Sequence, residues 1–213
     1  MSAPGCWTRR AVLGLLPIAA VATAAPAPAP EAAAAFVRRL GERAFAVLRR
    51  RDLDRAGKLR ALEVLVEEAT DLELLARLVL GRYWRRATPA QRARFVDLFR
   101  RLLRKSLAER LDDYGGQTLE VVGAEPVGRA DVLVHTRVRG PGTGKALAVD
   151  WRVRRRNGRF VVIDVIAEGV SLLITQRSQV AEVIGREGID GLLRVLEERL
   201  RRPGGPTPSP RPS

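Results

Sequence analysis

The chain has 213 residues, of which 46% are hydrophobic and 29% charged, an ordinary composition for one globular domain with a sizeable core. The only cysteine is Cys6, which excludes a disulfide bridge within the chain. Lys and Arg number 38 against 24 acidic residues, a net charge of +14. Such charge permits contact with nucleic acid, an anionic membrane or acidic partners, or it is simply an arginine-rich solvated surface.

Residues 1–24 are predicted to be an export signal peptide. Arg9 and Arg10 precede a short apolar stretch over residues 11–21, and Ala22-Thr23-Ala24 has the small-x-small pattern of a cleavage site. The arginine pair is twin-arginine-like, but a general secretion leader also needs positive charge, so the export route stays open. Cys6 precedes the apolar stretch, unlike a lipoprotein cysteine, and is expected to leave with the leader.

The rest of the chain divides into three parts. Residues 25–30 form an Ala-Pro linker. Residues 31–202 form a single domain, in which no segment is long and apolar enough to span a bilayer. Residues 203–213 are Pro-rich and are predicted to be a disordered tail.

Four helices are predicted in the first half of this domain, because apolar residues recur there at helical spacing. Asp54 is a candidate cap for the second helix. A capping box over residues 70–73 opens the third helix, and Gly81 suits its end. Thr88, followed by Pro89 and Gln91, forms another capping box. The predicted helices cover residues 31–50, 54–68, 71–80 and 89–112.

In the second half of the domain, apolar residues recur at every second position instead of at helical spacing, which indicates strands. Asn157-Gly158 is the strongest hairpin signal in the chain. Two C-terminal helices are predicted over residues 172–186 and 190–201. The four predicted strands cover residues 117–124, 131–139, 145–156 and 159–167.

Helices followed by a block of antiparallel strands predict an α+β fold. The simplest layout is a curved antiparallel sheet of about four strands, packed by several helices around an apolar pocket. This layout is similar to the NTF2-like cone with added helices. The apolar faces of the third and fourth helices would converge there with the third and fourth strands.

Catalytic chemistry finds little support in the sequence. His135 is the only histidine, and without cysteines or clustered carboxylates it cannot make a standard zinc site. Asp150 and Asp164 lie in adjacent predicted strands, so they are either paired carboxylates or cross-strand partners of Arg152 or Arg154. The second interpretation fits Asp164 less well, because Asp164 alternates with apolar residues along its strand. The arginines are not interleaved with exposed aromatic residues, which argues against nucleic-acid binding. We therefore predict no enzyme, no catalytic residue, no metal site and no cofactor.

Four pieces of the sequence, in this order and spacing, resemble the MlaC-type periplasmic phospholipid-binding proteins, also called the toluene-tolerance family. The resemblance covers about residues 36–200. The heavy use of Arg, the leader and the tail depart from it. The four pieces are Val79-Leu80-Gly81-Arg82-Tyr83-Trp84 with Ala87-Thr88-Pro89-Ala90-Gln91, Tyr114-x-Gly116-Gln117-Thr118, Val149-Asp150-Trp151-Arg152-Val153, and Ile166-Ala167-Glu168-Gly169-Val170-Ser171 with Gly188-Ile189-Asp190-Gly191-Leu192.

The resemblance implies a periplasmic carrier of the Mla system, which maintains the lipid asymmetry of the outer membrane. Such a protein holds the acyl chains of a phospholipid in an apolar pocket. It exchanges lipid with an inner-membrane ABC transporter that has an MCE-domain subunit, and with an outer-membrane lipoprotein–porin complex. We expect a monomer that contacts membrane surfaces transiently.

Seven residues are predicted from this resemblance to line or guard the lipid pocket. An exported NTF2-like enzyme or a binder of another small hydrophobic ligand is the alternative interpretation. The seven predicted lipid-binding residues are Val79, Tyr83, Trp84, Phe95, Phe99, Val149 and Trp151.

Overall fold

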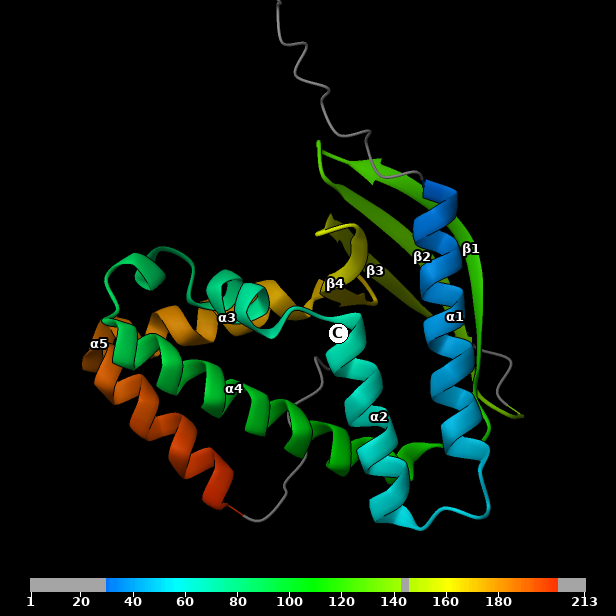
Figure 1. Ribbon diagram of the computed structural model, residues 1–213, viewed down its shortest axis with the longest axis horizontal. Coiled ribbons are helices and arrows are strands. Elements are labelled where there is room, and N and C mark those ends of the chain that lie inside the picture. The colour runs from blue at the N-terminus through cyan, green and yellow to red at the C-terminus, as the bar shows by residue number, and fades with distance from the viewer. Residues whose placement is uncertain (1–29, 143–145, 203–213) are drawn as a thin grey trace, which may run out of the picture.

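The computed structural model describes residues 30–142 and 146–202. The predicted leader, almost all of the Ala-Pro linker and the predicted tail lie outside these ranges. In the described part, helices and a single antiparallel sheet confirm the α+β fold (Figure 1). No helix among the described residues combines the length and the apolar character needed to cross a membrane.

The four N-terminal helices lie close to their predicted positions. Asp54 caps α2 by accepting a hydrogen bond from the Gly57 amide, and the Thr88–Gln91 capping box begins α4. The predicted box over residues 70–73 is corrected, because Asp71 caps α3 and the Thr70 hydroxyl instead donates to Val66 at the end of α2. The helices are α1 Pro30–Arg49, α2 Arg55–Ala69, α3 Leu72–Leu80 and α4 Pro89–Arg110, with 3₁₀ turns η1 Gly81–Arg85 and η2 Leu111–Asp113.

The sheet has five antiparallel strands in sequence order, one more than predicted. Asn157 and Gly158 both have positive φ, as the two-residue hairpin requires. The additional strand, β5, has two residues that follow the turn at Glu168 and Gly169 and pair antiparallel with the end of β4. The strands are β1 Thr118–Val127, β2 Asp131–Arg139, β3 Ala146–Arg156, β4 Arg159–Ala167 and β5 Val170–Ser171.

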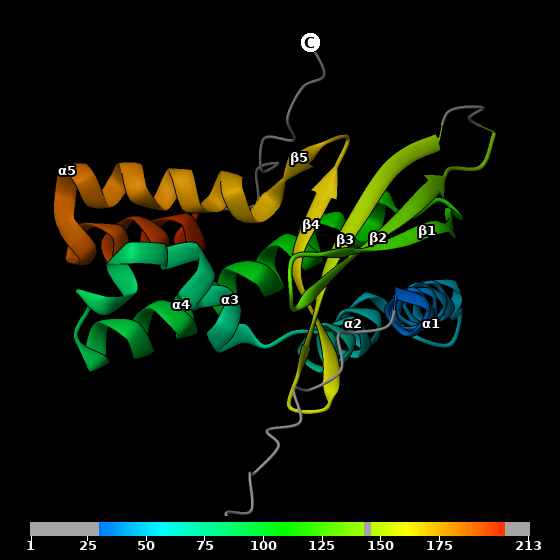
Figure 2. The ribbon, with the colours of Figure 1, turned by 90° about the horizontal axis from the view of Figure 1, so that it is seen from above.

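Helix α5, Leu172–Arg201, contains a break that separates the two predicted C-terminal helices. Gly188 has φ 72° and ψ −176°, a backbone conformation that is essentially restricted to glycine. The chain turns back at this residue, and Figure 2 shows the two arms of α5 side by side. Residues from both arms enter the same core, including Val180 and Leu192.

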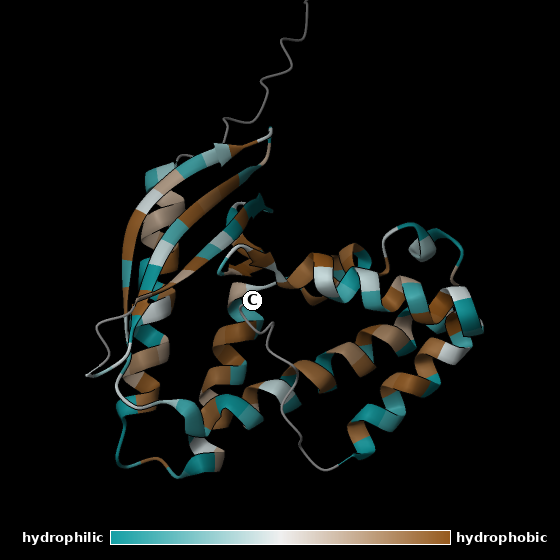
Figure 3. Cartoon of the chain, turned by 180° about the vertical axis from the view of Figure 1, so that it is seen from behind, coloured by the Kyte–Doolittle hydropathy of each residue, from teal (hydrophilic) through white to brown (hydrophobic). Residues whose placement is uncertain are grey.

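The elements form two lobes, and α2 lies between them (Figures 1 and 2). In the sheet lobe, α1 packs on one face of the sheet, which we call the inner face. In the helical lobe, α3, α4 and α5 pack on one another beyond β4. Hydrophobic and hydrophilic residues alternate along the strands, as expected for strands with one covered face (Figure 3).

Each lobe has its own core. The helical lobe buries a cluster that includes Phe95 and Leu98, which are 1% and 0% exposed. In the sheet lobe, Val37 of α1 packs against Val134 and Val153 on the inner face. Burial of each such side chain contributes about 1.5–3 kcal/mol. A third cluster, called the inner cluster below, joins α1, α2 and the end of α4: Leu40, Ala44, Val47, Leu48, Leu59, Leu62, Leu65, Leu107 and Leu111.

Candidate functional site

Five of the seven predicted lipid-binding residues lie together in the helical lobe. Val79, Tyr83 and Phe95 are buried in its core, and Trp84 and Phe99 are half-buried against it. The rings of Phe95 and Phe99 stack with centroids 6.0 Å apart. These five residues therefore form one contiguous apolar region.

The elbow between α3 and α4 is braced by arginines. The Arg82 guanidinium lies 4.9 Å from the centre of the Tyr83 ring, and that of Arg92 lies 5.4 Å from the Trp84 ring. Arg92 Nε also donates a hydrogen bond of 2.8 Å to the Trp84 carbonyl. Cation–π contacts of this kind contribute about 0.5–1 kcal/mol at exposed sites. The aromatic pair is thus held in a fixed orientation at the edge of the helical core.

Val149 and Trp151 lie elsewhere, on the inner face of the sheet. Trp151 packs against the cluster beneath α1, and its Nε1 donates a 3.1 Å hydrogen bond to Thr136 Oγ1. The Thr136 hydroxyl in turn donates to the Val149 carbonyl at 2.5 Å. Val149 and Val153 are buried on this face of β3, whereas Leu147 is 45% exposed.

The structure therefore corrects the expectation that the apolar faces of α3 and α4 converge with both β3 and β4. Helix α3 has two apolar faces. Its Leu74 packs on Val161 and Ile163 of β4, while Val79 packs into the cluster formed with α4 and α5. The two arms of α5 together supply the partner surface that the sequence interpretation had assigned to the sheet.

A groove runs between α2 and α4, on the surface where the two lobes meet. Its volume is about 100 Å³, below the roughly 300 Å³ at which small-molecule pockets begin. Two glutamates and two arginines border an apolar floor. The lining residues are Glu63, Val66, Glu67, Leu72, Arg100, Leu103, Arg104 and Leu107.

The floor of this groove borders the inner cluster. Leu107 lines the groove and also packs in the inner cluster. Leu48 and Leu111, at the other end of that cluster, line a second groove of about 340 Å³ beside Tyr114. Leu107 and Leu111 are four residues apart and so follow one face of the helix. A row of packed apolar side chains, called the apolar path below, thus connects the α2–α4 groove through the inner cluster with the second groove.

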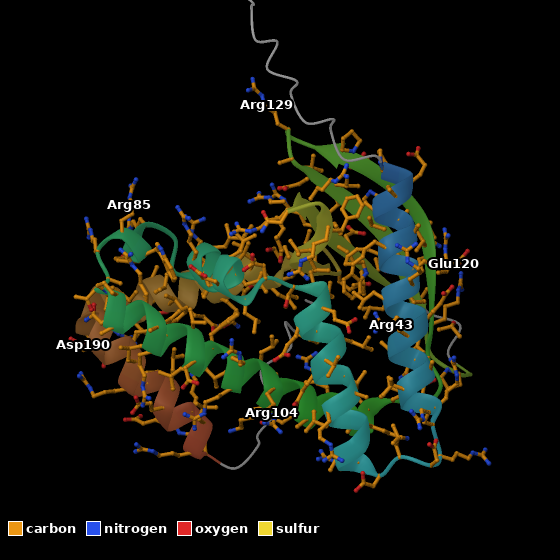
Figure 4. All side chains as sticks on the ribbon, viewed as in Figure 1. Arg43, Arg85, Arg104, Glu120, Arg129 and Asp190 are labelled. Carbon is orange, nitrogen blue, oxygen red and sulfur yellow. The ribbon has the colours of Figure 1, made fainter. Side chains whose placement is uncertain are left out.

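Ion pairs hold α2 against its neighbours around this path. Arg104 Nε lies 2.7 Å from Glu63 Oε1, and Figure 4 places Arg104 where α4 passes α2. Glu63 Oε1 is buried and has no hydrogen-bond partner among the described residues. The ion pair with Arg104 is therefore the main interaction that offsets the loss of its contact with water. Because the Arg104 side chain is 61% exposed, the pair is worth at most about 1 kcal/mol. Two further pairs on α2 are Arg55–Asp112 at 3.0 Å and Arg43–Glu68 at 2.7 Å.

The candidate catalytic carboxylates have structural partners. Asp150 Oδ1 lies 2.9 Å from His135 Nδ1 on the outer face of the sheet, which corrects the predicted pairing with Arg152 or Arg154. Residues 135 and 150 are direct cross-strand partners in the β2–β3 register. Asp164 accepts hydrogen bonds from Ser171 Oγ at 2.5 Å and from the Leu173 amide at 2.9 Å, and so fixes the start of α5.

The arginines of β3 bind a different carboxylate. Asp131 is 3% exposed and lies 2.7 Å from Arg152 Nη2 and 2.6 Å from Arg154 Nε. Burial alone would raise the pKa of Asp131, but the hydrogen bonds from Arg154 and Arg152 outweigh it and hold the pKa below its ordinary value. In the described ranges, no group of three or more His, Cys, Asp or Glu residues is arranged to hold a metal ion.

The profile of the MlaC protein family matches residues 38–198. The chain belongs to the MlaC family. It is 25% identical over 137 residues to the intermembrane phospholipid transport system binding protein MlaC of Haemophilus influenzae. It is 27% identical over 131 residues to the toluene tolerance protein ttg2D of Pseudomonas putida. These matches span 62% and 61% of this chain, but only 64% and 60% of the two relatives' own lengths.

The MlaC-family fold is also seen in a solved structure of a phospholipid-binding protein from Ralstonia solanacearum in complex with a phospholipid. That protein shares 30% sequence identity, and the match covers 79% of this chain and 96% of that chain with a TM-score of 0.69. The fold of this MlaC-family chain therefore has a solved counterpart with a lipid bound.

Sequence reasoning on this MlaC-family chain missed the α2–α4 groove. One signal was present, because Leu103, Leu107 and Leu111 recur at intervals of four along α4 and η2. This row lies on a different side of α4 from the core residue Leu98, so one helix serves two apolar regions. The elbow motif drew attention to the first region and away from the second.

Proposed function

We propose that this protein carries phospholipid across the periplasm. The observation that carries the proposal is the match to the phospholipid complex from Ralstonia solanacearum, which extends over 96% of that chain at 30% identity. The match to the MlaC family profile over residues 38–198 agrees with it.

The physical requirement on such a carrier is to keep acyl chains out of water. Each buried methylene contributes about 0.8 kcal/mol, so a chain of about sixteen carbons resists exposure by about 12 kcal/mol. The apolar path along α2 and α4 offers contacts of this kind, since the inner cluster is built almost wholly from aliphatic side chains. In our proposal the acyl chains enter between α2 and α4 and separate side chains that otherwise pack on one another.

The seven predicted residues fall into two candidate positions for the chains. Val149 and Trp151 face the same side of the sheet as α1 and the inner cluster, which suits acyl chains that continue from the groove. The five residues around Phe95 and Phe99 form the alternative position inside the helical lobe. Tryptophan emission distinguishes the two positions, because Trp84 lies in the helical lobe and Trp151 on the inner face of the sheet.

The partners in this proposal follow from the transport system named for the Haemophilus relative. The exported monomer would receive or deliver lipid at an inner-membrane ABC transporter with an MCE-domain subunit. At the outer membrane it would meet a lipoprotein–porin complex, with transient contact to the membrane surface. Its action would maintain outer-membrane lipid asymmetry.

Solvent extraction of the purified full-length protein, followed by mass spectrometry, tests the proposal. We expect phospholipid in about one-to-one ratio with the protein, or uptake of phospholipid after incubation with vesicles. A protein that neither co-purifies with phospholipid nor takes it up would overturn the carrier function. Extraction of a different small hydrophobic molecule would favour the alternative, a binder or enzyme for that ligand.

A further inference from the structure

The α2–α4 groove combines an apolar floor with charges of both signs. Glu63 and Glu67 come from α2, and Arg100 and Arg104 come from α4. Its floor includes Leu103 and Leu107. Residues three or four apart lie on one helix face, so each helix presents its two charges as a pair along the groove.

The four charges are not equivalent. Glu63 and Arg104 bind each other at 2.7 Å and so neutralise one another. Glu67 and Arg100 are both exposed, and neither forms an ion pair or a side-chain hydrogen bond within the described ranges. The groove therefore presents one free carboxylate and one free guanidinium above an apolar floor.

We propose that this groove seats the head group of a zwitterionic phospholipid, an inference that rests on the proposed carrier function. The Arg100 guanidinium binds the phosphate, for which its planar fork is suited. The Glu67 carboxylate binds the amine of an ethanolamine head group. The first acyl methylenes lie on Leu103 and Leu107, and Leu107 leads them into the inner cluster.

The size and charge of the groove favour this occupant over others. A volume of about 100 Å³ is too small to enclose whole acyl chains, so this open groove suits a partly solvated head group with the first methylenes beside it. A purely anionic head group, such as phosphatidylglycerol, would satisfy Arg100 but leave Glu67 facing negative charge. The net charge of +14 would by itself favour the anionic lipid, so a preference for the zwitterion must come from the groove.

Competition between two phospholipids with identical acyl chains, with dioleoylglycerol as the reference that lacks a head group, tests the proposal. The full-length protein is incubated with vesicles of dioleoylphosphatidylethanolamine, dioleoylphosphatidylglycerol and dioleoylglycerol, and the bound lipids are extracted and quantified. We expect about threefold more ethanolamine lipid than glycerol lipid, the size of effect that exposed ion pairs give. Glu67→Lys should reverse this preference, and Arg100→Gln should lower both phospholipids about threefold relative to dioleoylglycerol.

Matched control variants distinguish the effect of the charges in the groove from the effect of the net charge of the protein. Glu42→Lys makes the same change in net charge at an exposed position of α1, and Arg101→Gln removes the neighbouring arginine, which pairs with Asp97. Both should leave the lipid ratios of the wild type unchanged. Equal uptake of the two phospholipids by the wild type, or a Glu67→Lys variant with wild-type ratios, would overturn the head-group assignment while leaving the carrier function standing. Uptake of no phospholipid by any variant would overturn the carrier function itself.

Discussion

Arg104 of α4 and Glu63 of α2 form an ion pair of 2.7 Å that spans the groove between the two helices. Helix α2 lies between the two lobes, and this ion pair holds it against α4 across the groove. Arg104 is largely exposed, whereas the Glu63 oxygen is buried. The two partners therefore respond differently to substitution.

Removal of this ion pair should have a small, measurable effect on stability. In a double-mutant cycle with Glu63→Gln and Arg104→Gln, we expect a coupling energy of about 0.2–1 kcal/mol. Arg104→Gln alone should cost more than Glu63→Gln alone, because it leaves a partly buried carboxylate without a partner. Urea unfolding of the four proteins measures these values, and a coupling energy near zero would mean that the pair does not close the groove.

A bulky residue at position 107 should block the apolar path. Leu107→Trp places a larger side chain between the groove and the inner cluster, so we expect phospholipid uptake to fall at least tenfold. Overpacking should lower the free energy of unfolding by about 1–3 kcal/mol, which leaves the fold intact. Leu102→Trp is the matched control, because Leu102 lies on α4 but packs against the helical core. Equal loss of uptake in both variants would place the path elsewhere.

Tryptophan emission should report where the acyl chains lie. Trp84 is in the helical lobe and Trp151 on the inner face of the sheet, both half-buried. If the chains reach the sheet, phospholipid loading will shift the emission of the wild type and of Trp84→Phe but not of Trp151→Phe. The opposite pattern would assign the chains to the five residues of the helical lobe. Trp151→Phe should also cost about 0.5–1.5 kcal/mol through loss of the hydrogen bond to Thr136.

Asp131 should make stability depend on acid pH. Its pKa is lower in the folded protein than in the unfolded chain, so its contribution is fully present above about pH 4, the ordinary Asp pKa. That contribution is lost as the pH falls through the lowered folded-state value. Asp131→Asn should cost about 2 kcal/mol at pH 7, with the difference from wild type shrinking below pH 4.

Urea unfolding across this pH range tests the assignment of Asp131. The control is Asp97→Asn, since Asp97 is half-exposed and lies 3.8 Å from its arginine. This substitution should change the free energy of unfolding by less than about 0.5 kcal/mol at every pH. A difference between Asp131→Asn and wild type that persists undiminished at pH 3 would contradict the pKa argument.

Two glycines of α5 should respond in opposite directions to alanine. Gly188→Ala should cost about 1–3 kcal/mol, because φ 72° and ψ −176° are unfavourable for any side chain although a Cβ would meet no atom within 4 Å. Gly185→Ala, in regular helix with equally open space, should raise stability by about 0.5–1 kcal/mol. Thermal unfolding of both variants measures these changes. A Gly188→Ala protein as stable as the wild type would argue against the turn in α5.

Much of the fold and part of the site followed from local rules. Thr88 and Asp54 cap their helices as predicted, and the Asn157-Gly158 hairpin sets the pairing of β3 with β4. These features depend on neighbours within a few residues, so the sequence contains what is needed to find them. The motifs around Tyr83 and Trp151 likewise indicated the family that the profile match confirms.

Contacts between distant segments were decided only by the tertiary structure. A helical pattern shows that Val79 and Phe99 lie on an apolar face, but it does not say that α5 turns back at Gly188 to cover them. The pairing of Asp131 with two arginines depends on the β2–β3 register and the burial of that end of the sheet. The α2–α4 groove exists because two helices that are separated in the sequence by α3 and η1 meet in space, and local propensity does not predict such a contact.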